Sequence, residues 1–442
     1  MARSRVVVVG GGTVGLEVAR RLDRRSRRIE TTVVDSAGAS VYQSLLPEVA
    51  GGVIDPRHAV LPLRAGLRHA SVVAGTACGL DPDRRRLTVR LVSGDEEELR
   101  YDQLAVAPGA VTKLLPVPGL AERAIGFQTV AEAARLRDHV LGRLQFASQA
   151  TDPARRARAL TFAFVGGGYS GVEAVGELAN LAGDARRQHP SISGQDLHFV
   201  LVEATDTILP MVQPGLREAA LHDLRSRGID VRLETVIESV DDEAIHLSDG
   251  TDLATDTLVW CAGVRAHPSV TELGLPTDEN GAVVVDATLA VQGVGGVWSA
   301  GDCAAVPDLV RGGTCPPSAQ YALRQGRHLA GNIERVLAGR APTEFRYRQI
   351  GELISLGRMR AVGEIGGLGV RGRPAWLLRA AYHVARVPTW QRKVRIGLEW
   401  TINAAFPRET TSLGFARDVR APMEHALDAV DERRRQTTRP QL

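Results

Sequence analysis

The chain has 442 residues, 44% hydrophobic and 24% charged, an ordinary balance for folded globular domains that excludes a mainly disordered protein. At about 150 residues per domain, this length predicts roughly three units. The formal charge of +3 is too small for a dedicated nucleic-acid binder, so no nucleic-acid partner is expected; residues 340–420, with 15 Arg and Lys against 6 Asp and Glu, favour an anionic partner.

The first predicted element is a strand at residues 6–9, and no charged-then-apolar leader precedes it. No run approaches the roughly 20 apolar residues that a membrane-spanning helix needs. None of the four cysteines forms a C-x-x-C pair, which argues against a redox dithiol and against a disulfide framework. We therefore expect a protein that stays on the cytoplasmic side.

Residues 5–35 are predicted to form a strand, a glycine turn, a helix and a second strand. Four valines lead into G-G-G-T-V-G at 10–15, and the second strand ends at Asp35. The same arrangement returns 156 residues later, with the glycine turn at 166–171 and Glu203 ending the second strand. The chain is therefore organised around an internal repeat of one unit.

A G-x-G-x-x-G turn between a strand and a helix is typical of dinucleotide binding. Glycines let the backbone approach a pyrophosphate, and the helix N-terminus offers free N–H groups and a partial positive charge. The downstream carboxylate accepts hydrogen bonds from ribose hydroxyls. Two complete units indicate two dinucleotides, most simply a flavin and a nicotinamide dinucleotide. Glu203 would repel a 2′-phosphate, which favours NADH over NADPH.

Apolar runs and turn residues predict the elements between and after the repeats. They are short strands at 71–92, a buried run at 104–107, a helix at 129–148, a linker at 152–158, short strands at 229–247, a buried run at 258–263, a strand at 296–300 and a helix at 318–338. The strand at 296–300 turns at Gly301 and Asp302. A carboxylate there suits a flavin ribityl hydroxyl, and a plain Asp turn is the alternative.

From residue 341 the pattern changes to short strands and two basic, aromatic helical stretches. Trp390, Val394, Leu398 and Ile402 recur at helical spacing beside basic residues. Each stretch covers about 12–17 residues, or about 18–25 Å, too short to cross about 30 Å of hydrocarbon. Helices lying in the membrane interface fit better, with a dimer interface or ordinary packing as the alternative. The polar C-terminal end is expected to fray.

These motifs resemble those of type II NADH:quinone oxidoreductases over nearly the whole chain. The two glycine units resemble the family's FAD and NADH units. Residues 107–110 and 261–264 resemble its two strand-end turns, and residues 299–302 resemble its second FAD motif. These features are shared with the wider superfamily of disulfide and ferredoxin reductases.

Three segments resemble this family more narrowly. Residues 42–52 resemble its segment beside the flavin ring, residues 318–322 resemble its A-Q-x-A-x-Q helix start, which faces flavin and quinone, and the C-terminal region resembles its membrane-docking helices. Arg324 departs from the helix motif, because it stands where the second glutamine is usual, with Gln325 beside it.

The resemblance implies an α/β fold with two Rossmann-like dinucleotide-binding domains, for FAD and NADH, and a C-terminal α+β membrane-docking region. The implied boundaries are 1–125 for the first part of the FAD domain, 126–284 for the NADH domain, 285–340 for the second part of the FAD domain, and 341–442 for the C-terminal region with its polar tail.

The resemblance also supplies candidate site residues. Glu173, one turn into the second unit's helix, would lie near nicotinamide and flavin and orient the substrate or relay a proton, and a solvated helix residue is the alternative. With Gln320 and Arg324 it forms the candidate catalytic set. The candidate cofactor-binding residues are Gly10, Gly12, Thr13, Val14, Gly15, Asp35, Ser36, Gln43, Ala77, Ala107, Pro108, Gly109, Gly301, Asp302, Ala319, Gln320, Gly166, Gly168, Tyr169, Ser170, Gly171, Glu173, Glu203, Ala262 and Gly263.

The implied activity is hydride transfer from NADH to FAD and then transfer of two electrons to a membrane quinone, menaquinone or ubiquinone, without proton pumping. The expected partners are that quinone, an anionic membrane surface contacted through 375–406, and a second copy in a homodimer. The protein would be peripheral on the cytoplasmic side of the cell membrane.

Two alternatives remain open. One is a soluble FAD-dependent NAD(P)H oxidoreductase in which Arg324 binds a polar substrate, and the other is a flavoprotein redox sensor. Only Cys78 lies in the first unit, which lacks the close cysteine pair of disulfide reductases, and the other cysteines are expected to be structural thiols. No histidine shows metal-ligand spacing, so no metal site is expected.

Overall fold

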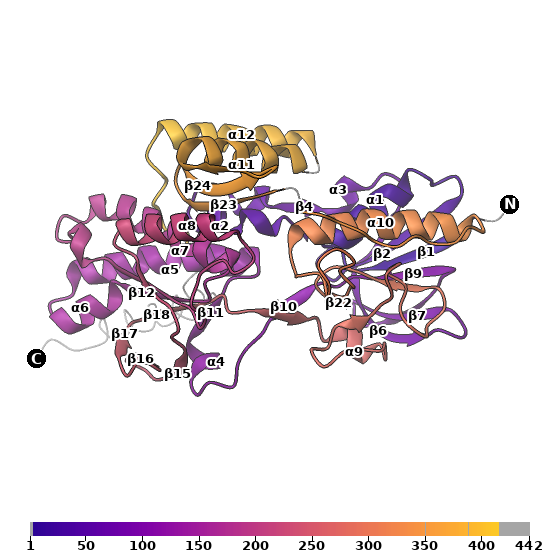
Figure 1. The fold of residues 1–442 in the computed structure, drawn as a ribbon, viewed down its shortest axis with the longest axis horizontal. Helices are drawn as coiled ribbons and strands as arrows, with labels where there is room; N and C mark the ends of the chain where they lie inside the picture. The colour runs from indigo at the N-terminus through magenta and orange to yellow at the C-terminus, as the bar shows by residue number, and fades with distance from the viewer. Residues whose placement is uncertain (1–2, 350, 388, 415–442) are drawn as a thin grey trace, which may run out of the picture.

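The computed structural model describes residues 3–349, 351–387 and 389–414, and the C-terminal end that the sequence predicts to fray lies outside these ranges. Two α/β units lie side by side, and two C-terminal helices lie across one edge of the second unit (Figure 1). These helices are α11 (Gly372–Arg386) and α12 (Trp390–Ala405).

The first unit is built on a five-stranded parallel sheet in the order β21-β9-β1-β2-β5. Its strands are β1 (Ser4–Val9), β2 (Ile29–Val34), β5 (Ser71–Val73), β9 (Gln103–Val106) and β21 (Val297–Ser299). Residues 6–9 are all buried, as expected of a strand covered on both faces. One face carries α1 (Thr13–Asp23) and α10 (Ala319–Leu337), and the other carries the antiparallel strands β6 (Gly75–Asp81), β7 (Arg86–Leu91) and β8 (Glu96–Arg100) (Figure 1).

The second unit repeats this plan, with a parallel sheet in the order β11-β18-β12-β13-β14. Its strands are β11 (Ala124–Gly126), β12 (Thr161–Val165), β13 (His198–Val202), β14 (Asp230–Arg232) and β18 (Thr257–Trp260). Helices α5 (Val130–Gln149) and α7 (Tyr169–Ala185) cover one face, and the antiparallel strands β15 (Ile237–Val240), β16 (Ala244–Leu247) and β17 (Asp252–Ala254) lie on the other. The sequence repeat is thus also a structural repeat.

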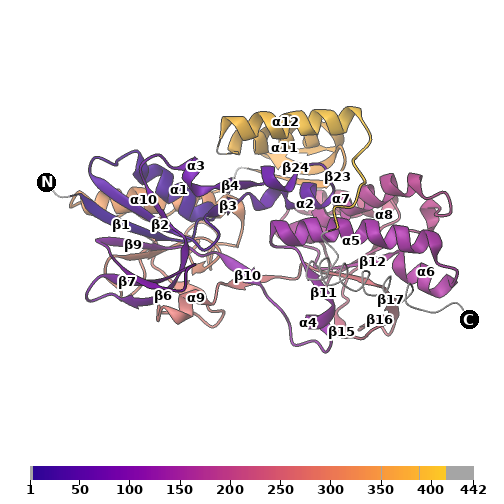
Figure 2. The same ribbon diagram turned by 180° about the vertical axis from the view of Figure 1, so that it is seen from behind.

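A two-stranded antiparallel ribbon joins the units. It pairs β10 (Ala110–Thr112) with β19 (Val264–Ala266), and Figure 2 shows β10 running between the two sheets. The remaining elements are β3 (Ala39–Val41), η1 (Gln43–Leu45), α2 (Leu46–Ala50), η2 (Pro56–His58), β4 (Val60–Pro62), α3 (Leu63–Gly66), α4 (Leu120–Arg123), α6 (Pro153–Ala159), η3 (Arg186–Gln188), η4 (Gly194–Asp196), α8 (Pro214–Ser226), α9 (Ser269–Glu272), β20 (Val283–Val284), β22 (Ala304–Ala305), β23 (Gly351–Gly357), β24 (Arg360–Ile365) and β25 (Leu368–Arg371).

The hydrophobic core of the second unit also takes in segments from both ends of the chain. Leu46 and Val49 of α2, Leu356 of β23 and Ile396 of α12 all belong to it. A segment that precedes the second repeat and a region that follows it therefore converge on α5 and α7.

The expected α/β fold class with two Rossmann-like units is confirmed. The helix predicted at 318–338 is α10, and Ser318 caps it by accepting a hydrogen bond from the Tyr321 N–H. The prediction of a linker at 152–158 is wrong. Residues there form α6, because the Asp152 side chain accepts hydrogen bonds from the first N–H groups and a proline opens the helix.

Within the described ranges, no helix is both long enough and apolar enough to cross a bilayer.

Candidate active site

In the first glycine turn, two glycines are packed tightly against neighbouring backbone and a third faces open space. Gly10 has φ +93°, and a Cβ there would come within 2.3 Å of the Ala107 carbonyl oxygen. A Cβ at Gly15 would lie 1.8 Å from the Gly10 carbonyl oxygen, so glycine is required at both positions. At Gly12, the N-cap of α1, a Cβ would meet nothing within 4 Å. The open side of the turn is therefore the N-terminus of α1.

The second glycine turn has the same geometry. Gly166 has φ +104°, and a Cβ there would come within 2.9 Å of the backbone of Ala262. A Cβ at Gly171 would lie 1.9 Å from the Gly166 carbonyl oxygen, and one at Gly168, the N-cap of α7, would meet nothing within 4 Å. The two glycine turns therefore share the same close backbone contacts and the same open position.

Each turn is tied to its downstream carboxylate. The Gly11 N–H donates to Asp35 Oδ2 at 2.8 Å, and the Gly167 N–H donates to Glu203 Oε2 at 2.5 Å. Glu203 Oε1 also accepts a hydrogen bond from the Thr205 N–H at 2.8 Å. Both carboxylates are thus fixed beside an open helix N-terminus, where a ribose hydroxyl is expected to bind.

This geometry fits two dinucleotides. Neither α1 nor α7 has a side-chain cap, so their first N–H groups remain available to phosphate oxygens. The first turn would hold the pyrophosphate of FAD, and the second that of NADH.

The loop after β21 packs against the first turn. A Cβ at Gly301 would lie 2.6 Å from Val14 Cγ2, and the Gly301 N–H donates to Gln325 Oε1 at 2.7 Å. Burial raises the pKa of the adjacent Asp302 carboxyl. No sequence motif points to Gln325, yet Gln325, and not Arg324, is the α10 side chain that holds this loop.

Gln320 and Arg324 lie on the side of α10 that meets the C-terminal region. The Arg324 guanidinium lies 4.2 Å from the ring centroid of Tyr347, and Arg324 Nη1 donates to the Gln320 carbonyl oxygen at 3.0 Å. The Tyr347 hydroxyl donates to Gln320 Oε1 at 3.1 Å, and Gln320 Nε2 donates to the Gly351 carbonyl oxygen at 3.1 Å. The three side chains form one connected group, in which a cation–π contact holds Arg324.

Glu173 lies in a buried ion-pair cluster between three elements. Its Oε1 accepts a hydrogen bond from the Ser355 N–H at 2.8 Å and lies 3.1 Å from Arg379 Nη2 of α11. The Arg379 side chain is 2% exposed and also pairs with Glu48 of α2. Burial raises the pKa of Glu173 to about 7. The alternative of a solvated helix residue is wrong, because this side chain is enclosed by α2, β23 and α11.

A second cation extends the cluster. Arg408 pairs with Glu177 at 3.0 Å, and the Ser355 hydroxyl donates to Glu177 Oε1 at 3.3 Å. Burial also raises the pKa of Glu48, although Arg379 opposes the shift. The raised pKa values of Glu48 and Glu173 therefore favour the protonated form of these two carboxyl groups.

No sequence motif assigns a role to Glu48, Arg379 or His383. The Tyr42 hydroxyl lies 3.1 Å from His383 Nδ1, which connects the segment at 42–52 to α11. One sequence signal could have indicated this pair, because Glu48 and Arg379 each interrupt an otherwise apolar run. Charged side chains in such runs are buried only when they are paired.

The remaining candidates differ in exposure. Thr13, Pro108, Gly109 and Tyr169 are half-buried, Ala77 is buried, and Ser36, Gln43, Ser170, Gly263 and Ala319 are exposed. Tyr169 donates its hydroxyl hydrogen to Glu352 of β23. Among the described residues, no hydrogen bond joins Gln43 or Ala77 to either glycine turn.

The four cysteines are unpaired. Burial raises the pKa of Cys261 to about 12 and that of Cys303 to about 11, so both remain protonated thiols. No group of three or more His, Cys, Asp or Glu side chains in the described part of the chain could hold a metal ion.

Comparison with known proteins defines the class. The profile of the family described as pyridine nucleotide-disulphide oxidoreductase matches residues 4–326, and the chain belongs to this family. Within it, the chain falls among the type II NADH:quinone oxidoreductases. The enzyme of this type named Ndh, from Mycobacterium tuberculosis, is 30% identical over 415 residues, which cover 90% of this chain and 88% of the relative.

A second relative supports this placement, and a solved structure supports the fold. The demethylphylloquinone reductase NdbB of Synechocystis sp. is 30% identical over 90% of this chain and 96% of its own. The solved structure of NDH2 from Plasmodium falciparum in complex with NADH has a TM-score of 0.85 at 15% identity and covers 93% of this chain and 100% of that chain. The expected enzyme class, an FAD-dependent NADH:quinone oxidoreductase, is confirmed at the level of the family.

Proposed function

We propose that the protein transfers a hydride from NADH to FAD and two electrons onward to a membrane quinone, without pumping protons. The observation that carries the proposal is the duplicated turn geometry, in which each open helix N-terminus lies beside a fixed carboxylate. Asp35 and Asp302 would bind the hydroxyls of FAD, and Glu203 those of NADH. Bound FAD supplies the hydride acceptor and the electron donor.

The chain's own residues would position the substrates and supply protons. With a pKa of about 7, Glu173 holds a proton below neutral pH and releases it above, which suits a proton relay. Arg379 orients the Glu173 carboxylate. Gln320 and Arg324 are the proposed contacts to the acceptor. The overall reaction of NADH and quinone to NAD⁺ and quinol takes up one proton, which this region would deliver.

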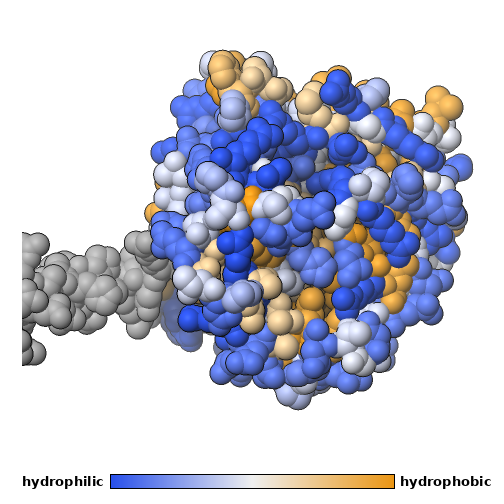
Figure 3. Space-filling view, turned by 90° about the vertical axis from the view of Figure 1, so that its left-hand side faces the viewer, coloured by the Kyte–Doolittle hydropathy of each residue, from blue (hydrophilic) through white to orange (hydrophobic). Residues whose placement is uncertain are grey.

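The surface of α11 and α12 suits a membrane-held acceptor. Ile396 and Trp400 of α12 are buried in the core. The four α12 residues that recur at helical spacing form an exposed apolar stripe: Trp390, Val394, Leu398 and Ile402 are 72%, 50%, 56% and 54% exposed. Figure 3, which views the side of the second unit, shows apolar side chains at its upper edge, where these helices lie. A regular exposed apolar stripe of this kind marks an interaction surface.

We assign this surface, residues 375–406, to docking on an anionic membrane from the cytoplasmic side, with menaquinone or ubiquinone as the acceptor. The competing proposal is that a second copy of the chain covers this surface in a homodimer.

Vesicle sedimentation tests the docking. Leu398→Glu places a charge on the stripe, and Val92→Glu is the matched control, since Val92 is 73% exposed on the first unit. We expect the L398E protein to lose binding to vesicles that contain phosphatidylglycerol, while V92E binds like wild type. If L398E keeps its vesicle binding and turns a dimer into a monomer, the surface is a dimer interface and the docking proposal is wrong.

A further inference from the structure

A small cavity lies between the buried ion-pair cluster and the helices α11 and α12. Its volume is about 20 Å³. The residues that line it include Glu48 and Glu177 of the cluster, Trp376 of α11, Trp400 of α12 and Arg408. A cavity needs roughly 10–15 Å³ to hold one water molecule, so this one has room for a single water and for no larger ligand.

Two buried polar atoms of the lining residues make no hydrogen bond with any described residue. One is Oε2 of Glu48, a residue that is 3% exposed. Glu48 Oε1 is held by Arg379, which does not line the cavity, so Oε2 is the carboxyl oxygen on the cavity side. The other atom is Arg408 Nε, whose neighbouring Nη1 and Nη2 atoms both donate hydrogen bonds. A water in the cavity can accept a hydrogen bond from Nε and donate one to Oε2.

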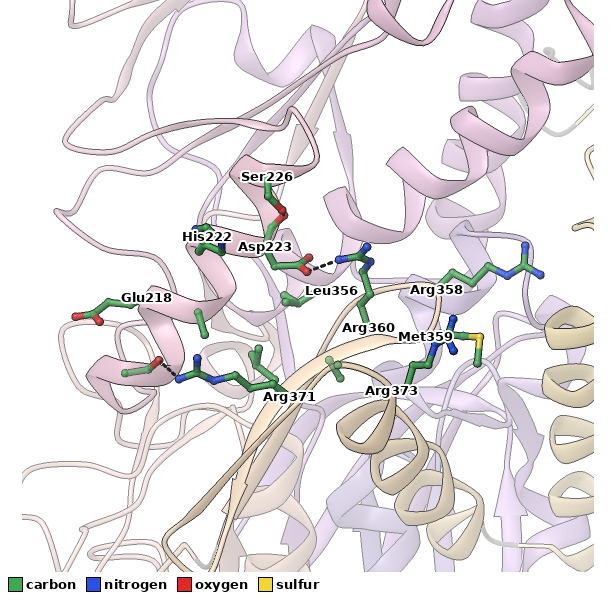
Figure 4. A pocket seen from close by; sticks show the side chains of 15 residues that line it. Glu218, His222, Asp223, Ser226, Leu356, Arg358, Met359, Arg360, Arg371 and Arg373 are labelled. Carbon is green, nitrogen blue, oxygen red and sulfur yellow. Dashed lines mark hydrogen bonds and ion pairs between the residues drawn. The ribbon is translucent and has the colours of Figure 1, made fainter.

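The opposite wall of the cavity leads toward solvent. Arg358 and Met359, in the turn between β23 and β24, line the cavity and also line a groove of about 900 Å³ beside α8 (Figure 4). Arg371 and Arg373 on the rim of this groove are exposed. The half-buried Arg358 and Met359 therefore lie between a solvent-exposed groove and the cavity that Glu48 lines.

The charges of the cluster favour one bound proton. Three carboxyl groups, of Glu48, Glu173 and Glu177, are enclosed with the guanidinium groups of Arg379 and Arg408. The set is neutral when one carboxyl group is protonated. Burial raises the pKa of both Glu48 and Glu173, so these two are the candidates to hold that proton.

The other charged or titratable groups near Glu48 do not change this balance. Arg358 of the cavity wall lies 3.6 Å from the Asp184 carboxylate, which matches its charge. Burial raises the pKa of the Tyr42 hydroxyl, which therefore stays neutral.

We propose that this cavity binds one water molecule, which passes a proton from solvent to Glu48 and so replaces the proton that Glu173 gives to the acceptor. Loss of that proton leaves three carboxylates against two guanidinium groups. The water then donates a proton to Glu48 Oε2 and regains one from solvent, so the cluster gains one proton, the water is unchanged and no electron moves. The proton step rests on the proposed function, in which Glu173 acts as a proton relay.

Two variants and a matched control test the proposal. Val53→Leu adds a methylene group at the cavity wall without changing any charge. Glu48→Gln keeps the shape of the side chain but cannot carry a proton. Val140→Leu is the control, because it adds the same methylene group in the same hydrophobic core and Val140 does not line the cavity.

Anaerobic stopped flow in H₂O and in D₂O, on the full chain with FAD bound, gives the kinetic readout. We expect NADH to reduce the flavin at the wild-type rate in all three variants. Reoxidation by a quinone analogue should be at least about 10-fold slower in V53L and E48Q, with a larger solvent isotope effect, and unchanged in V140L. Reoxidation of V53L at the wild-type rate with the wild-type isotope effect would overturn the proton step, whatever E48Q shows.

A crystal structure tests the water site itself. We expect an ordered water within hydrogen-bond distance of Glu48 Oε2 in wild type and its loss in V53L, and a dry cavity in wild type would overturn the site. Failure of the proposed function looks different, because wild type itself would then not be reoxidised by any quinone. The proton step would fall with that function, whereas the crystal structure would still decide the water site.

Discussion

At the scale of single residues, we propose that Glu203 selects NADH over NADPH. Its carboxylate is fixed beside the second glycine turn by the N–H groups of Gly167 and Thr205. On this proposal, Glu203→Ala would remove an acceptor for ribose hydroxyls and a charge that would repel a 2′-phosphate. We expect the KM for NADH to rise about 10-fold and the preference over NADPH to shrink.

Steady-state kinetics with both dinucleotides measure this effect. Asp206→Ala, at an exposed position three residues on, is the matched control and should keep the wild-type preference. An unchanged NADH preference in E203A would contradict the assignment of the second unit.

Glu173 predicts a dependence of stability on pH. Burial raises its pKa from 4.5 to about 7 in the folded protein. The protonated form is therefore favoured by folding, so its contribution is complete below pH 4.5 and is lost as the pH rises through about 7. We expect the free energy of unfolding to fall across this range in wild type and to fall less in Glu173→Gln.

Urea unfolding of both proteins at several pH values provides the measurement. Glu218→Gln, at an exposed glutamate of α8, should behave as wild type. Parallel pH profiles for wild type and E173Q would contradict the assigned burial of this carboxyl.

Some of these residues can be found from sequence, and others cannot. The roles of Gly10 and Gly166 can be predicted from the motif spacing, because the geometry of each turn depends only on the strand before it and the helix after it. The partnership of Glu173 with Arg379 spans 206 positions and depends on α7 meeting α11. Gln325 was missed because the family motif pointed to position 324, and only the orientation of α10 distinguishes the two.

At the scale of elements, Arg379 holds α11 against α2 and α7. It is enclosed between the carboxylates of Glu48 and Glu173. Arg379→Met leaves both carboxyls without their cation and is expected to lower the free energy of unfolding by about 3–5 kcal/mol.

The matched control for this prediction is Arg386→Met on the same helix, where the guanidinium lies 5.2 Å from the ring centroid of Tyr382. Its loss should cost at most about 1 kcal/mol. Adding Glu48→Gln to R379M should recover part of the stability. Equal losses for R379M and R386M in urea unfolding would show that the cluster does not bind the elements together.

Element boundaries show where local signals suffice. Ser318 begins α10 as expected, because an N-cap acts within one turn. The same rule explains α6, because the Asp152 side chain caps it and a proline opens its first turn. By contrast, the sequence could not place α2 in the core of the second unit, since this packing joins residues distant along the chain.

At the scale of the whole molecule, the two units and the C-terminal region meet around Glu173. The ion-pair cluster draws on α2, α7, β23 and α11, and α11 is one of the two helices that we propose dock on the membrane. The division at residues 125, 284 and 340 remains a prediction, and α2 already crosses it by packing into the second unit's core.

The central claim is that electrons pass from NADH through FAD to a quinone. Anaerobic double-mixing stopped flow tests it most directly: NADH first bleaches the flavin absorbance, and a menaquinone or ubiquinone analogue is then mixed in. We predict reoxidation by one of these quinones much faster than by oxygen. Fast bleaching followed by slow reoxidation with every quinone would leave the two nucleotide sites intact and contradict the claim.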